Sequence, residues 1–224
     1  MKKHWMFGVA VLVLLISLSG VTAQAQGMNA KLEIIPLYNF MSNGFGDARL
    51  GNHGYGLEVA YNINDNVGFM AAFSGNHGTT TPFSFGCDPT CSFNETQRQD
   101  FVTGTFGPIF YHHAGDFRMF SKALAGVSRG HWSARQTFPG SPGSFNEFGE
   151  KGTGFALRVG GGVDYRNTGR WGWRVIQLDY TFGNMNADGF DTCNGCTLET
   201  SHRAETINNV SVSTGFIWRF GGNQ

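Results

Sequence analysis

Residues 155–166, FALRVGGGVDYR, decide the fold class of this chain. Apolar residues alternate along it with small or charged ones: Phe155, Leu157, Val159, Val163 and Tyr165 against Ala156, Arg158, Gly160, Gly162, Asp164 and Arg166. A period of two is that of a β-strand with one apolar face and one polar face. A tilted strand needs about ten residues to cross a bilayer. The stretch is therefore predicted to be a membrane-spanning strand.

The same alternation recurs in residues 54–62 (GYGLEVAYN) and 210–220 (VSVSTGFIWRF). A weaker form of it appears in five further stretches, residues 31–41, 67–75, 100–111, 117–130 and 173–182. Together these stretches predict eight strands, and none of them has the period of an amphipathic helix.

The connections between these strands alternate in length. Short turns containing Asn, Asp or Gly are predicted at residues 62–66, 112–116 and 167–172. Long polar loops are predicted at residues 42–53, 76–97, 136–151 and 183–203. This layout predicts an all-β fold, an eight-stranded antiparallel up-and-down transmembrane β-barrel over residues 30–220. In such barrels the short turns lie in the periplasm and the long loops outside the cell, so both termini are expected in the periplasm.

Aromatic residues gather where the two ends of the wall are expected. Near the short turns lie Tyr61, Phe69, Phe110, Tyr111, Tyr165, Trp171, Trp173, Trp218 and Phe220, and near the long loops lie Tyr38, Phe40, Tyr55, Phe73, Trp132, Phe155, Tyr180 and Phe182. Two such belts are typical of rings placed at the two headgroup levels of a membrane.

The N-terminal residues 1–25 predict a cleaved signal peptide. Lys2 and Lys3 precede a short apolar run, and Ala23-Gln24-Ala25 gives the small residues of a cleavage site. Residues 26–224 are then one outer membrane barrel domain. The formal net charge is zero and there is no basic run, so a nucleic-acid partner is not expected.

Seven short blocks, in order along the chain, carry a family resemblance. They are residues 31–33 (KLE), 73–78 (FSGNHG), 105–108 (TFGP), 123–126 (ALAG), 160–164 (GGGVD), 174–180 (RVIQLDY) and 215–220 (GFIWRF). The chain resembles the small eight-stranded OmpA-like outer membrane β-barrel proteins, in particular the single-domain acidobacterial type. The resemblance implies outer membrane lipids and the barrel assembly machinery as partners, and a monomer. That machinery reads a terminal aromatic, whereas here four residues follow Phe220. Larger relatives add a peptidoglycan-binding domain, which is not expected here.

The inward side of the barrel is predicted to hold a charge network. Its expected members are Glu33, Glu58, Lys122, Arg158, Asp164, Gln177, Asp179 and Arg219. Opposite charges in a narrow lumen should pair, because an unpaired buried charge is costly. The resemblance suggests that such a network blocks or gates a narrow water path, and the alternative is a static polar core. Arg174, beside a short turn, is expected to meet lipid headgroups instead.

Four cysteines occur as two local pairs, Cys87 with Cys91 and Cys193 with Cys196. An exported chain meets an oxidising compartment, so disulfides are expected, preferably within each pair. A link between the two loops and a zinc site of four thiols remain as alternatives. No resident metal or cofactor is expected.

Three functional classes remain open. The first is a non-enzymatic outer membrane barrel with a structural, surface-contact or narrow-pore role, whose loops would meet an extracellular ligand that the sequence does not identify. The second is a lipid-modifying enzyme using Ser128 with His131, or Ser201 with His202. The third is a soluble periplasmic ligand-binding barrel, which requires the opposite facing, with Arg158, Asp164 and Arg219 pointing outward.

Overall fold

The computed structural model describes residues 31–45, 48–79, 83–86, 92–137, 145–166, 170–193 and 202–221. The strands are β1 (Leu32–Phe45), β2 (Ala48–Asn62), β3 (Val67–Thr79), β4 (Phe83–Gly86), β5 (Ser92–Ala114), β6 (Phe117–Thr137), β7 (Phe145–Arg166), β8 (Trp171–Cys193) and β9 (His202–Phe220). Within these ranges no helix is long and apolar enough to cross a membrane.

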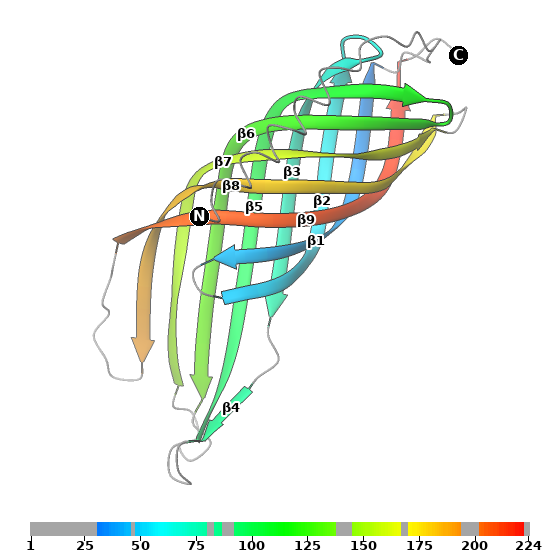
Figure 1. The fold of residues 1–224 in the computed structure, drawn as a ribbon. Helices are drawn as coiled ribbons and strands as arrows, with labels where there is room; N and C mark the ends of the chain where they lie inside the picture. Colours follow the sequence, from blue (N-terminus) through cyan, green and yellow to red (C-terminus); the bar gives the residue numbers. More distant parts are fainter. Residues whose placement is uncertain are drawn as a thin grey trace, which may run out of the picture.

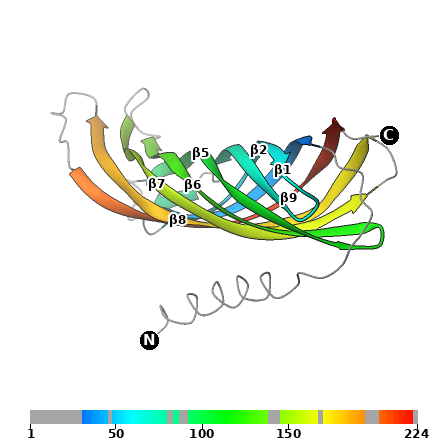
Figure 2. The same ribbon diagram turned by 90° about the horizontal axis from the view of Figure 1, so that it is seen from above.

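Eight of the strands close into a ring. Each pairs antiparallel with its neighbour, β1 pairs with β9, and β3 pairs with β5 (Figures 1 and 2). The predicted eight-stranded closed antiparallel barrel is therefore confirmed. The short strand β4 was not predicted, and it pairs only with Ser92–Glu95 at the beginning of β5, outside the ring.

The strands are steeply staggered. Hydrogen-bonded partners, followed once around the wall, run Phe40, His53, His77, Asp100, His131, Lys151, Asp188 and His202. On the remaining side Phe40 pairs with Val212, so the path closes ten residues along β9 (212 − 202 = 10). Such a stagger requires strands tilted by roughly 35–45°.

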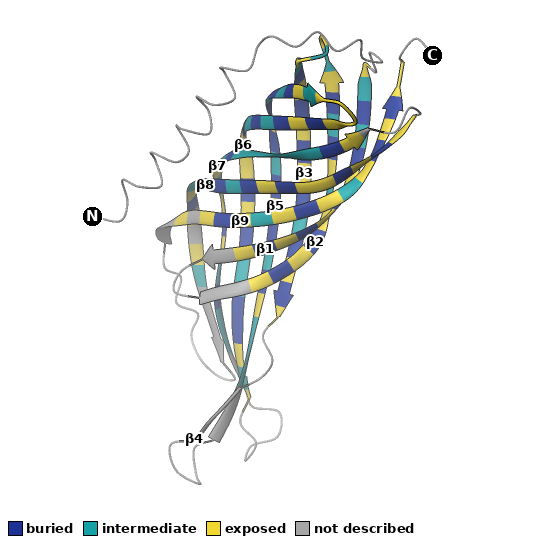
Figure 3. Ribbon diagram, turned by 45° about the vertical axis from the view of Figure 1, so that its right-hand side comes forward, coloured by how far each residue is buried: buried dark blue, intermediate teal, exposed yellow. Residues whose placement is uncertain are grey.

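Buried and exposed residues alternate along the strands, as Figure 3 shows, so successive residues face the lumen and the outer wall in turn. Along β3 the burial pattern is almost strictly alternating, with Phe73 exposed and its neighbour Ser74 buried. The charged residues Arg158, Asp164 and Arg219 are buried, whereas Trp218 is 45% exposed. This facing is opposite to what a soluble ligand-binding barrel requires, so that alternative is wrong.

The predicted long loops are largely strand. Residues 42–53, 76–97, 136–151 and 183–203 hold the ends of paired strands, and β5, β6 and β7 reach 23, 21 and 22 residues. Beyond the lipid-facing part of the wall the outward face of a strand meets water, so the apolar alternation disappears although backbone pairing continues. The sequence pattern therefore marks only the part of each strand that faces lipid.

The end of the barrel with the short turns, here called the turn end, carries an aromatic belt. Trp171, Trp173, Trp218 and Phe220 are exposed there, and the rings of Trp171 and Trp218 stack at 4.5 Å. At the opposite end, the loop end, Tyr38, Phe40, Tyr55, Phe73 and Phe155 are exposed. Two members of the predicted belts were misassigned, because Tyr111 and Trp132 lie at inward positions of β5 and β6.

A single charge introduced on the outer wall tests which part of the wall meets lipid. Leu178→Arg, in the middle of the exposed face of β8, is expected to lower the free energy of unfolding in lipid vesicles by about 2–4 kcal/mol. Asn186→Arg, on the same face beyond the apolar band, should cost about 1 kcal/mol or less. Urea titrations followed by tryptophan fluorescence give both values, and equal costs would contradict the assigned membrane level.

Candidate functional site in the barrel lumen

Eight charged side chains meet in the half of the lumen near the turn end. They form the ionic cluster, which consists of Glu33 (β1), Glu58 (β2), Arg118 and Lys122 (β6), Asp164 (β7), Arg174 and Asp179 (β8) and Arg219 (β9). All are buried, and six strands contribute. The alternation of each strand places these residues inward, because the other face of the strand is apolar and meets lipid.

Arg118 joins two carboxylates. Its two Nη atoms donate to the two carboxylate oxygens of Glu33, each at 2.7 Å, and Nη2 also donates to Oδ2 of Asp164 at 2.8 Å. The guanidinium lies over the ring of Tyr111, 4.3 Å from its centroid. On the other side of Glu33, Nε of Arg219 donates to Oε1 at 3.2 Å.

Arg174 continues the same chain of contacts. Its Nε donates to Oδ1 of Asp164 at 2.8 Å, and Nη1 donates to Oε2 of Glu58 at 2.5 Å. The guanidinium covers the ring of Phe120 at 3.9 Å.

Lys122 and the neutral Gln177 connect Glu58 to Asp179. Nζ of Lys122 lies 2.5 Å from Oε1 of Glu58 and 3.2 Å from Oδ2 of Asp179. The Gln177 amide donates to Glu58 at 2.9 Å and to Asp179 at 2.7 Å. One connected network therefore runs from Arg219 to Asp179.

The ionic cluster fills the lumen from wall to wall. In the ring β1-β2-β3-β5-β6-β7-β8-β9, strand β6 stands opposite β1, so the Arg118–Glu33 pair spans the diameter. The four carboxylates and four cations cancel in charge, as burial requires. Apolar side chains pack around them, and Ile35, Met70, Ile109 and Ile217 are fully buried.

Towards the loop end the lumen is polar but less charged. Arg158 donates to Oγ of Ser74 at 2.7 Å and to Oγ1 of Thr181 at 3.4 Å, and no carboxylate among the described residues pairs with it. Arg158 and Asp179 border a cavity of about 10 Å³, enough for roughly one water molecule. Above this cavity Met41, Phe101 and Met185 form an apolar layer that packs against Trp132.

The predicted site residues lie as follows. Glu33, Glu58, Lys122, Asp164, Gln177, Asp179 and Arg219 are together in the network, and Arg158 is in the lumen but apart from it. Arg118 was missed, although it shares the inward parity of Lys122. The expectation that Arg174 meets headgroups is wrong, because its side chain is fully buried. A bulge between Arg174 and Gln177 leaves two successive residues, Val175 and Ile176, on the outer wall and turns Arg174 inward.

The other candidate residues form no site in the described part of the chain. The hydroxyl of Ser128 lies in the lumen, 2.9 Å from that of Thr103, while His131 lies at an outward position three residues later. Cys87, Cys91, Cys196 and Ser201 lie outside the described residues. Cys193 ends β8 and His202 begins β9, but their side chains are not described.

A closed antiparallel ring with an apolar exterior and a charged, filled interior defines a transmembrane β-barrel. Residues 9–220 match the outer membrane protein beta-barrel domain family, and the chain belongs to this family. A comparison with curated protein sequences finds no match.

Solved structures share the fold at low identity. A major outer membrane protein from Thermus thermophilus is 8% identical, with 84% of this chain and 99% of that chain covered and a TM-score of 0.51. The outer membrane protease OmpT from Escherichia coli is 11% identical (89% and 100% covered, TM-score 0.48). Ail, the attachment invasion locus protein of Yersinia pestis, is 14% identical in its complex with the heparin analogue sucrose octasulfate (84% and 97% covered, TM-score 0.45). At these identities the likeness concerns the fold alone.

Removing one cation tests the ionic cluster. Arg118→Gln leaves Glu33 and Asp164 undercompensated, so the free energy of unfolding is expected to fall by about 3–5 kcal/mol. Arg158→Gln is the matched control, since this buried arginine contacts only hydroxyl groups, and it should cost less.

The double variant Glu33→Gln/Arg118→Gln should cost less than the sum of its two single variants, because the partners then lose their charges together. Urea unfolding in vesicles gives the free energy of unfolding of the wild type, of Glu33→Gln, Arg118→Gln and their double variant, and of Arg158→Gln. Additive costs, or an Arg158 effect as large as that of Arg118, would rule out the coupling.

Proposed function

We propose that this chain is a non-enzymatic, non-conducting outer membrane barrel that holds a tall strand wall at the cell surface as a contact surface. The observation that carries the proposal is the ionic cluster, which fills the lumen across its diameter. The fold and family are those of outer membrane barrels, and the proposal assigns the role within that class.

A filled lumen argues against conduction. An ion crossing the barrel would have to separate buried pairs such as Arg118–Glu33 and Arg174–Asp164, which are bonded at 2.7–2.8 Å. Breaking one partner away from a buried ion pair costs several kcal/mol. The apolar layer around Phe101 adds a second barrier towards the loop end.

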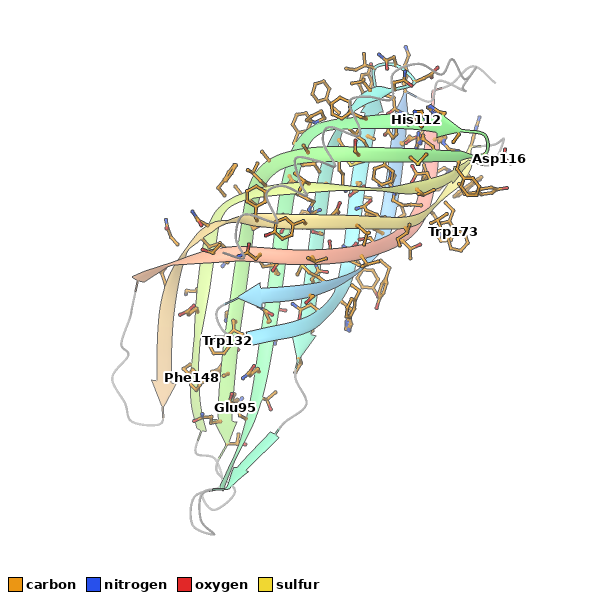
Figure 4. All side chains as sticks on the ribbon, in the orientation of Figure 1. Glu95, His112, Asp116, Trp132, Phe148 and Trp173 are labelled. Carbon is orange, nitrogen blue, oxygen red and sulfur yellow. The ribbon has the colours of Figure 1, made fainter. Side chains whose placement is uncertain are left out.

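The strand ends beyond the apolar wall supply the contact surface. Residues 92–101 of β5, 128–137 of β6 and 145–154 of β7 extend past Val102, Val127 and Phe155, the last large apolar residues of the wall. Ten residues of strand add roughly 33 Å along its axis. At inward positions of this extension Trp132 and Phe148 pack with their ring centroids 6.0 Å apart, far from Trp173 at the turn end, which leaves the outward side chains for contact (Figure 4).

Orientation and partners belong to the same proposal. We infer that the turn end and both termini face the periplasm, because the tight turns at Ile63–Asn66 and Gly115–Asp116 contrast with strands that project far at the loop end. The proposal also includes cleavage of the signal peptide after Ala25, insertion by the barrel assembly machinery and a monomeric state. The separation of Ser128 from His131 on opposite faces of β6 supports the absence of lipid-modifying activity.

Single-channel recording in planar bilayers tests the closed lumen. The wild type and Arg158→Ala are both expected to give no current, since the ionic cluster remains in each. Glu33→Ala/Arg118→Ala, which removes the pair across the diameter, is expected to give current. Discrete conductance steps from the wild type would instead establish a narrow pore.

Epitope insertion tests the orientation. An epitope placed within residues 138–144, between β6 and β7, should bind antibody on intact cells, whereas one placed between Gly115 and Asp116 should bind only after the outer membrane is permeabilised. Labelling of the Gly115 insertion on intact cells would reverse the assigned orientation.

A further inference from the structure

The outer wall of β2, β3, β5 and β6 contains an apolar groove of about 450 Å³ that is open to the surroundings. Its floor is made by small residues, Ala71, Gly104 and Ala125, and its sides by Leu57, Phe73, Phe106 and Val127. We call these seven residues the wall groove. The four side residues are 45–61% exposed, so they project from the wall around the small residues of the floor.

Gly104 makes the groove possible. It pairs with Phe73 on one side and with Val127 on the other, so two bulky side chains flank a position without one. A Cβ added at Gly104 would meet no atom within 4 Å. The space is therefore empty of protein, and a larger residue would fill it without a clash.

Two exposed cations stand beside the wall groove. Arg129 follows Val127 by one outward position on β6, and Lys151 lies diagonally opposite it on β7, two residues from its partner Thr153. In the described part of the chain, neither side chain forms a hydrogen bond or ion pair. Cross-strand diagonal neighbours lie close enough for long side chains to share one ligand.

The nearby Arg98 differs because it is already neutralised. Its Nε donates to Asp100 at 3.0 Å, and His77 also contacts this carboxylate. Partial burial raises the pKa of Asp100, but the His77 hydrogen bond and the Arg98 charge outweigh this effect, so its pKa lies below the usual value. Asp100 is therefore ionised at neutral pH and cancels Arg98. Arg129 and Lys151 form no ion pair among the described residues, although the exposed Asp188 is the cross-strand neighbour of Lys151 on β8.

Arg129 lies at the level where the wall changes character. Its row holds Tyr55, Gly75, Val102, Arg129 and Thr153, and the next row towards the loop end holds His53, His77, Asp100, His131 and Lys151. One row below Arg129, Leu57, Phe73, Val127 and Phe155 are all apolar. Because the strands are tilted, a row climbs around the wall, and the level is given by the change along each strand. On β6 the outward side changes from Val127 to Arg129, and on β7 from Phe155 to Lys151 within two outward positions, which places the cations at the headgroup level and the wall groove at the level of the acyl chains.

We propose that the wall groove, Arg129 and Lys151 bind one anionic lipid of the surrounding leaflet. An acyl chain fills the space over Gly104, and the phosphate of the headgroup lies between the two cations. The groove alone would accept any chain, and the charges select a phosphate-bearing, anionic headgroup. The proposal needs a barrel in a membrane, but it is independent of whether the lumen conducts and of which end faces outward.

A second copy of this chain fits the same surface less well. Closed dimers are usually two-fold symmetric and bring the same patch of each subunit together. Such contact would place Arg129 and Lys151 of one copy near those of the other, and like charges repel. The positive charge of Arg129 and Lys151 therefore favours an anionic lipid as the occupant.

Native mass spectrometry of the barrel released from detergent micelles tests the proposal. The probes are dioleoyl phosphatidylglycerol and dioleoyl phosphatidylcholine, which share their chains and differ in headgroup charge. The wild type is expected to retain one phosphatidylglycerol in strong preference to phosphatidylcholine. Arg129→Gln and Lys151→Gln should each lower this preference about fivefold, since a cation at the membrane surface contributes about that factor.

Two matched controls separate the site from general effects. Gly104→Leu should abolish retention of both lipids, whereas Gly75→Leu, at an equally open position outside the wall groove, should not. Lys31→Gln removes an exposed cation at the turn end and should leave the preference unchanged within about twofold. The β-sheet circular dichroism signal verifies that each variant is folded.

Several outcomes would overturn the proposal. These are equal retention of the two lipids by the wild type, an unchanged preference in Arg129→Gln, or equal effects of Gly104→Leu and Gly75→Leu in folded protein. Displacement of phosphatidylglycerol by excess inorganic phosphate would show an anion site that needs no lipid chain. A dimer mass that Gly104→Leu abolishes would assign the wall groove to a second copy.

Discussion

Backbone hydrogen bonding is the constraint on which this structure depends. Inside a bilayer no water can satisfy an unpaired N–H or C=O, so a sheet that crosses it must have no free edge. The pairing of β1 with β9, together with that of β3 with β5, removes both edges. Closure then fixes the rest, because every strand must present one face to lipid and the other to a narrow lumen.

Closure of the ring leaves a narrow lumen that side chains have to fill. Eight strands leave an interior that side chains fill, and in this chain the filling is largely ionic. Four carboxylates and four cations, distributed over six strands, contact one another across the ring. Strands β3 and β5 contribute no charge to the cluster and instead supply the buried Met70 and Tyr111, and Arg118 packs on the ring of Tyr111. The network therefore fills this part of the lumen and connects opposite walls of the barrel.

The sequence predicts the closed barrel well, because facing depends only on a period of two. Phe155, Leu157 and Val159 belong to the wall and Arg158 to the lumen in the structure as in the pattern. The alternation of apolar and polar residues does not predict strand where the outer face of the strand no longer meets lipid. Beyond Val102 and Val127 the outward face no longer meets acyl chains, so the apolar alternation ends although the strands continue into residues that were predicted as loops. The facing of Arg174 was predicted wrongly for another reason, because a bulge of one residue in β8 reverses the parity that Gln177 and Asp179 predict.

Charge balance could have corrected that failure from the sequence alone. The predicted lumen set contains four carboxylates, Glu33, Glu58, Asp164 and Asp179, but only three cations, Lys122, Arg158 and Arg219. A sealed interior must be close to neutral, so this deficit indicates that a cation is missing. The structure makes the deficit larger, because Arg158 contacts hydroxyl groups outside the cluster. Two cations are then required near the turn end, and Arg118 and Arg174 are the two that the structure brings there. In a narrow barrel, electroneutrality of the lumen therefore gives the number of inward cations still to be found, here Arg118, which has the inward parity, and Arg174, which periodicity assigns to the wrong face.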